Sequence, residues 1–255
     1  MKIIGVIPAR MAASRFPGKP LYKIHGKAMI EHVYLRANLY KDWDRLVVAT
    51  CDEEIKNFSE SKNFPVVMTG DHHTRALDRV AEAVENLSGT ADDDIIVCVQ
   101  GDEPMMRPDM IDAVVAPLLA DETIPCTVLA MHITDNQLWL NPDTVKIIHN
   151  DKGEVLYTSR SPIPFCKGEF SEDLMARRIY GILAFRWKYL KEFTANNETR
   201  LELLEACDSN RILDMHFTQH IAPYPSIQSF SVDSPSDLEL VKSHILDDGL
   251  TNLYQ

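Results

Sequence analysis

Two short segments carry side chains whose types and spacing suit phosphate and metal chemistry. The first is Ile7–Pro20 (IPARMAASRFPGKP), where Arg10, Arg15 and Lys19 supply three cations among small residues. Cationic side chains and accessible backbone amides are the groups that bind a triphosphate. The segment follows the apolar run Ile3–Ile7, and ligands of open α/β sheets bind beyond the carboxyl ends of strands. It is therefore a candidate triphosphate loop, with a solvated basic loop as the alternative.

The second segment is Val99–Pro104 (VQGDEP), which ends another apolar run. Asp102 in this segment is a candidate metal ligand, because magnesium takes one or two protein carboxylates and completes its octahedron with phosphate oxygens and water. The alternative is a plain turn at the Gly-Asp pair. Asp233, in the run SVDSP, would by itself be read as a helix cap or Asx-turn. Paired with Asp102, it becomes a candidate second metal ligand.

The sequence contains no motif for several other common kinds of active or binding site. The sequence has no Walker A or dinucleotide glycine pattern, no G-x-S-x-G and no H-E-x-x-H. His72 and His73 are adjacent, so on a helix or strand they cannot share one face as metal-binding histidine pairs do. The five cysteines are an odd number, lie far apart and form no C-x-x-C pair. This disfavours zinc ribbons and disulfide frameworks and favours a reducing, cytoplasmic setting.

The elements that must position these residues follow from the hydrophobic pattern. In the first half, short β-branched runs alternate with helical patterns, which predicts βαβ units on a mainly parallel sheet. The predicted strands are Ile3–Ile7, Leu46–Ala49, Val66–Met68 and Ile95–Val99. The predicted helices are Met29–Tyr40, Glu53–Lys62, Leu77–Leu87 and Met110–Leu119. Because Ile95–Val99 is apolar throughout, we expect a central strand that is covered on both faces.

The second half has a different pattern, with a turn at 151–153 between two strands. The predicted strands are Thr127–Met131, Val145–His149, Val155–Thr158 and Ile179–Phe185. Helices are predicted near Trp187–Thr194, near Leu201–Cys207 and from Ser234 onward. We therefore expect a single α/β domain over residues 1–255, with an inserted antiparallel subregion at about 125–215.

The composition and net charge limit the kinds of partner that we expect. Of 255 residues, 45% are hydrophobic and 25% charged, which is typical of a soluble globular protein. No run approaches the ~20 apolar residues of a membrane helix. Lys and Arg number 26 against 38 Asp and Glu, a net charge of -12. Such a surface repels nucleic acid and anionic membranes, so we expect neither as a partner, although a local basic pocket for a phosphate ligand remains compatible with it.

Taken together and in this order, the motifs resemble those of the 3-deoxy-manno-octulosonate cytidylyltransferases, the CMP-Kdo synthetases of lipopolysaccharide assembly. The motifs are P-A-R-x-x-x-S-R-x-P-G-K-P after the first strand, Val99–Pro104, and Val232–Glu239 (VDSPSDLE). Asn141–Lys146 (NPDTVK) and Leu156–Pro164 (LYTSRSPIP) are also similar to the family. The resemblance runs from Lys2 to about Val241, nearly the whole chain.

The resemblance implies a nucleotide-diphospho-sugar-transferase-like fold that joins CTP to a 3-deoxy-2-keto sugar acid, with Mg²⁺, giving a CMP-sugar and pyrophosphate. It also implies a homodimer built on the second-half strands. The nucleotide would be bound by Ala9, Arg10, Arg15, Lys19, Arg75, Arg79 and Gln100. Asp102 and Asp233 would hold the metal and, with Lys19, form the catalytic group. The acceptor would be bound by Arg160, Tyr180 and Glu205.

The chain departs from the family pattern at three places. His73–Arg79 (HTRALDR) stands where the family has H-x-S-G-T-[D/E]-R, so base-reading hydroxyls are replaced by Arg75 and Leu77. Ala176 replaces a sugar-binding His, and Leu204–Asp208 (LEACD) lacks a sugar-contacting Gln. These changes keep a second hypothesis open, in which the acceptor is an amino-octulosonate, a nonulosonate or a phosphonate. A non-catalytic nucleotide-binding protein is a third hypothesis, against which the retention of both aspartates argues.

Overall fold

The chain divides into two units, which are described separately. The computed structural model describes residues 1–12 and 15–254. Unit 1 contains Met1–Asp112 together with the C-terminal segment from Gln228, and unit 2 contains Ala113–Ile227. The predicted organisation, a single domain with a subregion at about 125–215, stays a prediction. The predicted α/β class is confirmed, because parallel strands dominate unit 1 and antiparallel pairs occur in unit 2.

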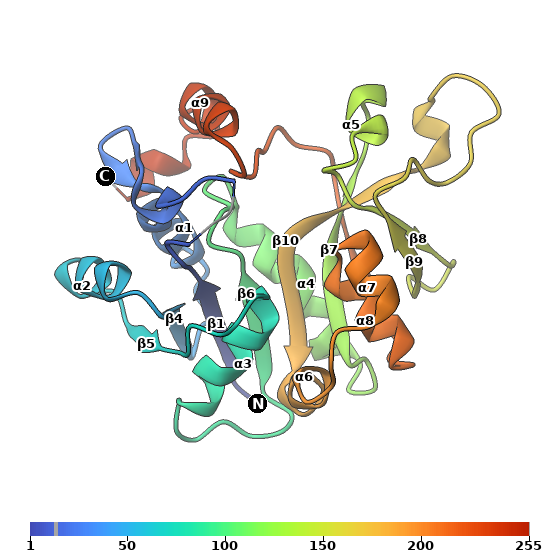
Figure 1. The fold of residues 1–255 in the computed structure, drawn as a ribbon. Helices are drawn as coiled ribbons and strands as arrows, with labels where there is room; N and C mark the ends of the chain where they lie inside the picture. The colour runs from blue at the N-terminus through green and yellow to red at the C-terminus, as the bar shows by residue number, and fades with distance from the viewer. Residues whose placement is uncertain (13–14, 255) are drawn as a thin grey trace. The chain divides into compact units, whose positions relative to one another are not determined.

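Unit 1 is built on four parallel strands. β1 (Ile3–Pro8) lies between β4 (Arg45–Thr50) and β6 (Ile95–Val99), and β4 also pairs with β5 (Val66–Met68) (Figure 1). Every residue of β1 and β6 is buried. A strand that is covered on both faces needs such an unbroken apolar run, as the sequence of β6 predicted.

The described part of unit 1 also contains four complete α-helices and one hairpin. They are α1 (Met29–Ala37), α2 (Glu53–Ser61), α3 (Ala76–Glu85), α9 (Pro235–His244) and the hairpin of β2 (Lys23–Ile24) with β3 (Lys27–Ala28). α2 packs against β4 and β5, whereas α3 packs against β1, β4 and β6. α3 turns Leu77, Val80 and Val84 inward, at the spacing of three and four that one buried helix face requires.

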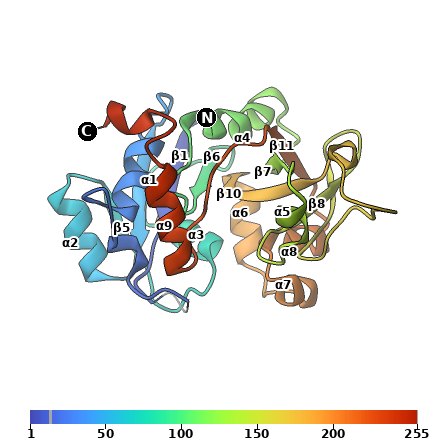
Figure 2. The same cartoon turned by 90° about the horizontal axis from the view of Figure 1, so that it is seen from above.

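The C-terminal segment returns to the start of the chain. Val232 and the α9 residues Leu238 and Val241 share a buried apolar cluster with Phe16 and Met29. Arg36 Nη2 of α1 donates to the carbonyl of Ile245, the C-cap of α9, over 2.9 Å, and the two helices project next to each other in the view from above (Figure 2). The cluster therefore holds the segment around Asp233 next to the loop that follows β1, although more than 200 residues of chain separate the two.

Unit 2 has β7 (Cys126–His132) at its centre. β10 (Arg177–Arg186) pairs with β7 in antiparallel fashion, and β11 (Gln219–Tyr224) pairs with it in parallel. β10 also pairs with β8 (Lys146–His149), which forms a hairpin with β9 (Val155–Ser159). The predicted antiparallel region is thus confirmed, with β11 as a parallel addition at its edge.

Most of the remaining helices are short. Unit 2 contains α5 (Asn136–Leu140), α6 (Trp187–Thr194), α7 (Arg200–Glu205) and α8 (Asp208–Asp214), and the division between the units falls within α4 (Pro108–Ala120). The 3-10 helices are η1 (Lys19–Leu21), η2 (Glu172–Leu174) and η3 (Leu250–Leu253). Among the described residues, no helix has both the length and the apolarity that crossing a bilayer demands.

Candidate active site

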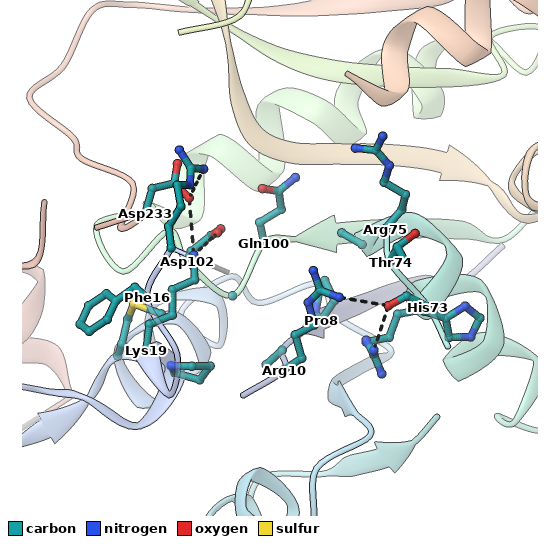
Figure 3. Close-up of a pocket in the computed structure, with 17 residues that line it drawn as sticks. Pro8, Arg10, Phe16, Lys19, His73, Thr74, Arg75, Gln100, Asp102 and Asp233 are labelled. Carbon is teal, nitrogen blue, oxygen red and sulfur yellow. Dashed lines mark hydrogen bonds and ion pairs between the residues drawn. The ribbon is translucent and has the colours of Figure 1, made fainter. Parts of the chain in front are cut away.

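A pocket of about 260 Å³ lies at the carboxyl ends of β1 and β6 in unit 1 (Figure 3). Because these strands are parallel neighbours, the segments that follow them begin at the same edge of the sheet. Nine of the predicted site residues line this pocket: Ala9, Arg10, Arg15, Lys19, Arg75, Arg79, Gln100, Asp102 and Asp233. The structure therefore brings the predicted triphosphate loop and both predicted metal ligands together. Ala13 and Ser14 of that loop lie outside the described residues.

Gly101 allows the two strand ends to approach each other. A Cβ at this position would lie 2.6 Å from the backbone oxygen of Pro8 and 3.3 Å from Ile30 Cδ1. Real Cβ atoms do not approach a carbonyl oxygen so closely, so any other residue would push the ends of β1 and β6 apart. The glycine therefore sets the distance between the segment of Arg10 and the segment of Asp102.

Lys19 is the centre of a charged cluster in the pocket. Its Nζ lies 2.8 Å from Asp102 Oδ2 and 3.6 Å from Asp233 Oδ1. It also donates to the Val232 carbonyl over 2.7 Å. Arg15 Nη2 lies 2.9 Å from the same Asp233 oxygen (Figure 3). The Lys19 side chain is only 13% exposed, so it is held by these partners, whereas Arg15 at 58% reaches into solvent.

Asp233 is placed by its neighbours and is not a helix cap. Val232 N donates to the Asp102 carbonyl over 2.9 Å, which ties the two acidic segments together. The N-cap of α9 is Ser234, whose side chain accepts from Asp237 N. Asp237 in turn accepts from the backbone N–H groups of Asp233 and Ser234. The carboxylate of Asp233 is thereby left to interact with cations in the pocket.

The acidic pair fits a divalent cation. Both carboxylates approach one cationic atom, Lys19 Nζ, so their oxygens converge on a common position. Two carboxylates beside a triphosphate pocket are the donor set that magnesium takes, since it completes its shell with phosphate oxygens and water. The residues present therefore suit Mg²⁺ better than a transition metal, which prefers nitrogen or sulfur ligands.

The opposite side of the pocket is formed by the loop between β5 and α3. Arg10 Nη1 and Arg79 Nη2 both donate to the His73 carbonyl, over 3.4 and 3.5 Å (Figure 3). Arg79 is buried and also donates to Thr69 Oγ1 and to the Gly70 carbonyl. It thus holds the loop in place as well as lining the pocket. Arg75 lines the pocket, while Leu77 is buried in α3.

Two of the predicted acceptor residues meet in unit 2. Arg160 N donates to Glu205 Oε2 over 2.8 Å, and Arg160 Nε donates to the Glu205 carbonyl over 2.8 Å. Tyr157 and Ser159 donate their hydroxyls to Glu205 Oε1. Burial alone would raise the pKa of Glu205, but these hydrogen bonds outweigh it and lower the pKa below its ordinary value. The carboxylate is therefore ionised and holds β9 to α7.

The third predicted acceptor residue is placed differently. Tyr180 is 1% exposed in β10, and its ring lies against the Arg178 guanidinium, 5.5 Å from the centroid. Ala176, which stands in place of the family's His, is buried with Ile133 and Trp139. The acceptor roles of Arg160, Tyr180 and Glu205 stay predictions.

Lys146 was not predicted as part of either site. It is fully buried, and its Nζ donates to the carbonyls of Asn141, Thr144 and Arg160 over 2.8, 2.6 and 2.6 Å. Burial lowers the pKa of Lys146 to about 8, and the nearby charge of Arg160 acts in the same direction. Its position within the NPDTVK motif was a signal that could have found it. Lys146 fixes the backbone from which the Arg160 side chain extends.

Glu103 and Ser231 are further residues that sequence reasoning missed. Ser231 Oγ donates to Glu103 Oε1 over 2.7 Å, and Glu103 is 3% exposed. Glu103 directly follows Asp102, and Ser231 lies two residues before Asp233. Their hydrogen bond is therefore a second link between the two acidic segments. The signal was present, since both residues lie inside the motifs that carry the candidate metal ligands.

Comparisons with known proteins agree with this geometry. A family model described as cytidylyltransferase matches residues 4–219. A 3-deoxy-manno-octulosonate cytidylyltransferase of Nitratidesulfovibrio vulgaris (strain DP4) is 39% identical, with 93% of each chain covered. The protein of the same name from Geobacter metallireducens is 37% identical, covering 94% of this chain and 96% of its own.

A solved structure shows the same fold. It is described as CMP:2-keto-3-deoxy-manno-octonic acid synthetase complexed with CTP. It superposes with a TM-score of 0.88 at 31% identity and covers 97% of this chain and 100% of its own. The family model, the sequence relatives and this structure all name the same kind of enzyme, and the relatives and the structure cover more than 90% of this chain. The chain is therefore a nucleotidyltransferase that belongs to the cytidylyltransferase family, in the group of the 3-deoxy-manno-octulosonate cytidylyltransferases.

Proposed function

We propose that this enzyme transfers CMP from CTP to 3-deoxy-manno-octulosonate, giving the CMP-sugar and pyrophosphate. The observation that carries the proposal is the cluster of Lys19, Asp102 and Asp233 in a pocket that also contains Arg10 and Arg15. Similarity supports the choice of substrates, since the relatives are named for this acceptor and the solved structure is described as a complex with CTP.

In the proposed reaction, the anomeric hydroxyl of the sugar acid attacks the α-phosphorus of CTP. The new bond forms between that oxygen and the α-phosphorus, and the bond from this phosphorus to the bridging oxygen breaks. Pyrophosphate leaves in line, and the proton of the hydroxyl passes to solvent water. Arg10, Arg15 and Lys19 bind the phosphates and offset the charge of the leaving group. Ala9, Arg75, Arg79 and Gln100 complete the proposed nucleotide site.

Asp102 and Asp233 are the residues proposed to hold Mg²⁺. When bound, the ion would supply charge neutralisation at the phosphates. Lys19 contacts both carboxylates and would orient them. On the acceptor side, Arg160 is proposed to meet the sugar carboxylate, with Glu205 and Tyr180 as further contacts. We also propose that the enzyme is cytoplasmic, forms a homodimer and serves lipopolysaccharide assembly, in keeping with the family resemblance.

The test is pyrophosphate release with CTP, Mg²⁺ and 3-deoxy-manno-octulosonate. We expect release that depends on all three components, and chelation of Mg²⁺ should abolish it. Parallel reactions with an amino-octulosonate, a nonulosonate and a phosphonate should give lower kcat/KM values. A higher kcat/KM for one of these acceptors would reassign the substrate. Tight CTP binding without turnover on any sugar acid would contradict the acceptor altogether.

A further inference from the structure

Three potential metal ligands converge on the loop between β5 and α3. His72 and His73 belong to this loop, and Glu82 lies on α3. One ligand atom from each residue lies within 4.8 Å of the other two. His73 Nε2 already bonds Glu82 Oε2, and the two imidazole centroids are 4.1 Å apart. Two imidazoles and a carboxylate thus face a common point.

Adjacent histidines can converge here because the loop is neither helix nor strand, the two settings in which neighbouring side chains diverge. Gly70 makes the arrangement possible. A Cβ at Gly70 would lie 2.4 Å from both Cε1 and Nδ1 of His72, so this imidazole occupies the space that a side chain at position 70 would fill.

The carboxylate of the group is held in place by the backbone. Both oxygens of Glu82 accept from Gly70 N, over 3.0 and 2.9 Å. His72 is exposed, so an ion can reach the group from solvent.

We propose that His72, His73 and Glu82 form a binding site for a divalent transition metal of the zinc type. Zinc sites with two histidines, one glutamate and a water-filled fourth position are an established class. Ligands about 2.1 Å from a tetrahedral ion lie about 3.4 Å apart. Metal binding would therefore require His72 to turn toward the other two ligands and the hydrogen-bonded pair of His73 and Glu82 to open slightly. Imidazole nitrogen favours zinc over magnesium, so this site is chemically distinct from the oxygen ligands Asp102 and Asp233.

The proposed site would act on the nucleotide pocket through one residue. The backbone carbonyl of His73 accepts from Arg10 and Arg79 at the pocket, while its imidazole points away from Arg10 (Figure 3). An ion bound to the His73 imidazole would therefore restrict the motion of the loop that carries Thr74 and Arg75. Both of these residues line the pocket. The inference rests on this geometry and does not depend on which acceptor the enzyme uses.

The test is metal binding by the full chain after chelation, measured in excess Mg²⁺. We expect the wild type to bind one Zn²⁺ per chain, and Co²⁺ in its place to show the visible absorption of a tetrahedral site. Loss of even an outer partner of a metal ligand weakens affinity about 10- to 100-fold, so H72A and E82Q should each weaken Zn²⁺ binding by about 100-fold or more. Zn²⁺ should also slow amide hydrogen exchange of residues 70–75 in the wild type alone.

The matched control is His244→Ala. His244 Nδ1 lies 3.0 Å from Asp247 Oδ2, an exposed histidine–carboxylate pair that lacks a third ligand in the described part of the chain. This variant should bind Zn²⁺ as the wild type does. His72 is exposed, so H72A should fold normally, which a melting curve without metal verifies. No stoichiometric Zn²⁺ in the wild type, or equal affinity in the wild type and H72A, would overturn the proposal and leave His73 and Glu82 as a simple ion pair.

Discussion

Lys19 contacts both Asp102 and Asp233. These two ion pairs can be judged by how much they contribute to the stability of the fold. Each pair is partly exposed, with side chains at 13, 26 and 39%, so water screens the attraction. Exposed ion pairs are worth about 0–1 kcal/mol, too little to explain why two acids and a lysine gather at one edge of a sheet. Their placement is better explained by the charges of the proposed nucleotide and Mg²⁺.

Asp102→Asn tests that explanation. The substitution keeps the shape and turn preference of Asp102 but removes the charge proposed to bind Mg²⁺, so the melting temperature should barely change. Turnover should fall by about 100-fold or more, because metal charge stabilisation is worth several kcal/mol and each ~1.36 kcal/mol is a factor of ten. The measurement is pyrophosphate release beside a melting curve.

The control is Glu239→Gln, which removes an exposed carboxylate that lies 2.7 Å from Lys242 Nζ outside the pocket. It should leave both quantities unchanged. An Asp102→Asn enzyme that melts normally and keeps more than about a tenth of its activity would show that Asp102 is not the metal ligand.

At the scale of elements, the site depends on how closely β1 and β6 end together and on how β9 meets α7. In the first case a glycine permits a close approach of backbone to backbone. In the second case a carboxylate on α7 accepts hydrogen bonds from Tyr157 and Ser159 of β9 and from Arg160 just after it. Neither feature is catalytic in itself, and each can be tested by a single substitution.

Gly101→Ala should disturb the pocket through the strands. The added methyl would meet the Pro8 carbonyl at 2.6 Å, so the strand ends must separate. We expect a loss of about 1–3 kcal/mol in the free energy of unfolding, as for other overpacked sites, and a higher KM for CTP. Gly168→Ala is the control, because a Cβ there has no atom within 4 Å. Unchanged urea unfolding and KM for Gly101→Ala would mean that the strand ends adjust freely.

Glu205→Gln should alter the acid sensitivity of the fold. The folded-state pKa of Glu205 lies below its ordinary value of 4.5, so the folded form binds protons less readily than the unfolded chain. Glu205 therefore stabilises the fold above pH 4.5, and this contribution is lost as the pH falls through the lowered folded-state pKa. Urea unfolding of wild type and variant from about pH 6 to about pH 3 should show a flatter decline for Glu205→Gln.

The matched control for Glu205→Gln is Glu169→Gln, which removes an exposed carboxylate of the same unit. This variant should keep the pH dependence of the wild type. Identical pH dependence in the wild type and Glu205→Gln would argue against an ionised, hydrogen-bonded Glu205.

At the scale of the whole molecule, the prediction concerns the oligomeric state. Unit 2 exposes several leucines on neighbouring elements: Leu156 at 57% on β9, and Leu203 and Leu204 at 55 and 70% on α7. Exposed large apolar side chains are common at protein–protein interfaces. They agree with the proposed homodimer through the second half of the chain.

Sedimentation velocity should therefore give twice the chain mass. Leu204→Glu places a charge on this surface and should shift the protein to the monomer without unfolding it. Leu253→Glu is the control, since Leu253 is similarly exposed, at 66%, but belongs to unit 1. A wild-type protein that sediments as a monomer at all concentrations would contradict the homodimer.

The sequence by itself predicted most of the elements and nine of the residues that line the pocket in unit 1. Periodicity predicted β6 as Ile95–Val99 and α6 as Trp187–Thr194, with the bounds the structure has. Local patterns were sufficient there because burial imposes a short repeat on the residues concerned. β11 was missed, since its sequence QHIAPY mixes polar residues with a proline and only pairing with β7 makes it a strand.

Contacts between distant segments were decided by the tertiary structure alone. The role of Asp233 was ambiguous in sequence, because a helix cap and a metal ligand use the same residue type. Packing of Val232 against Phe16 and capping by Ser234 settled its position. The same holds for His72 and His73, which were dismissed as a ligand pair on the assumption of regular structure. The loop after Gly70 lets both approach Glu82, because backbone outside helices and strands is free of their fixed periodicity.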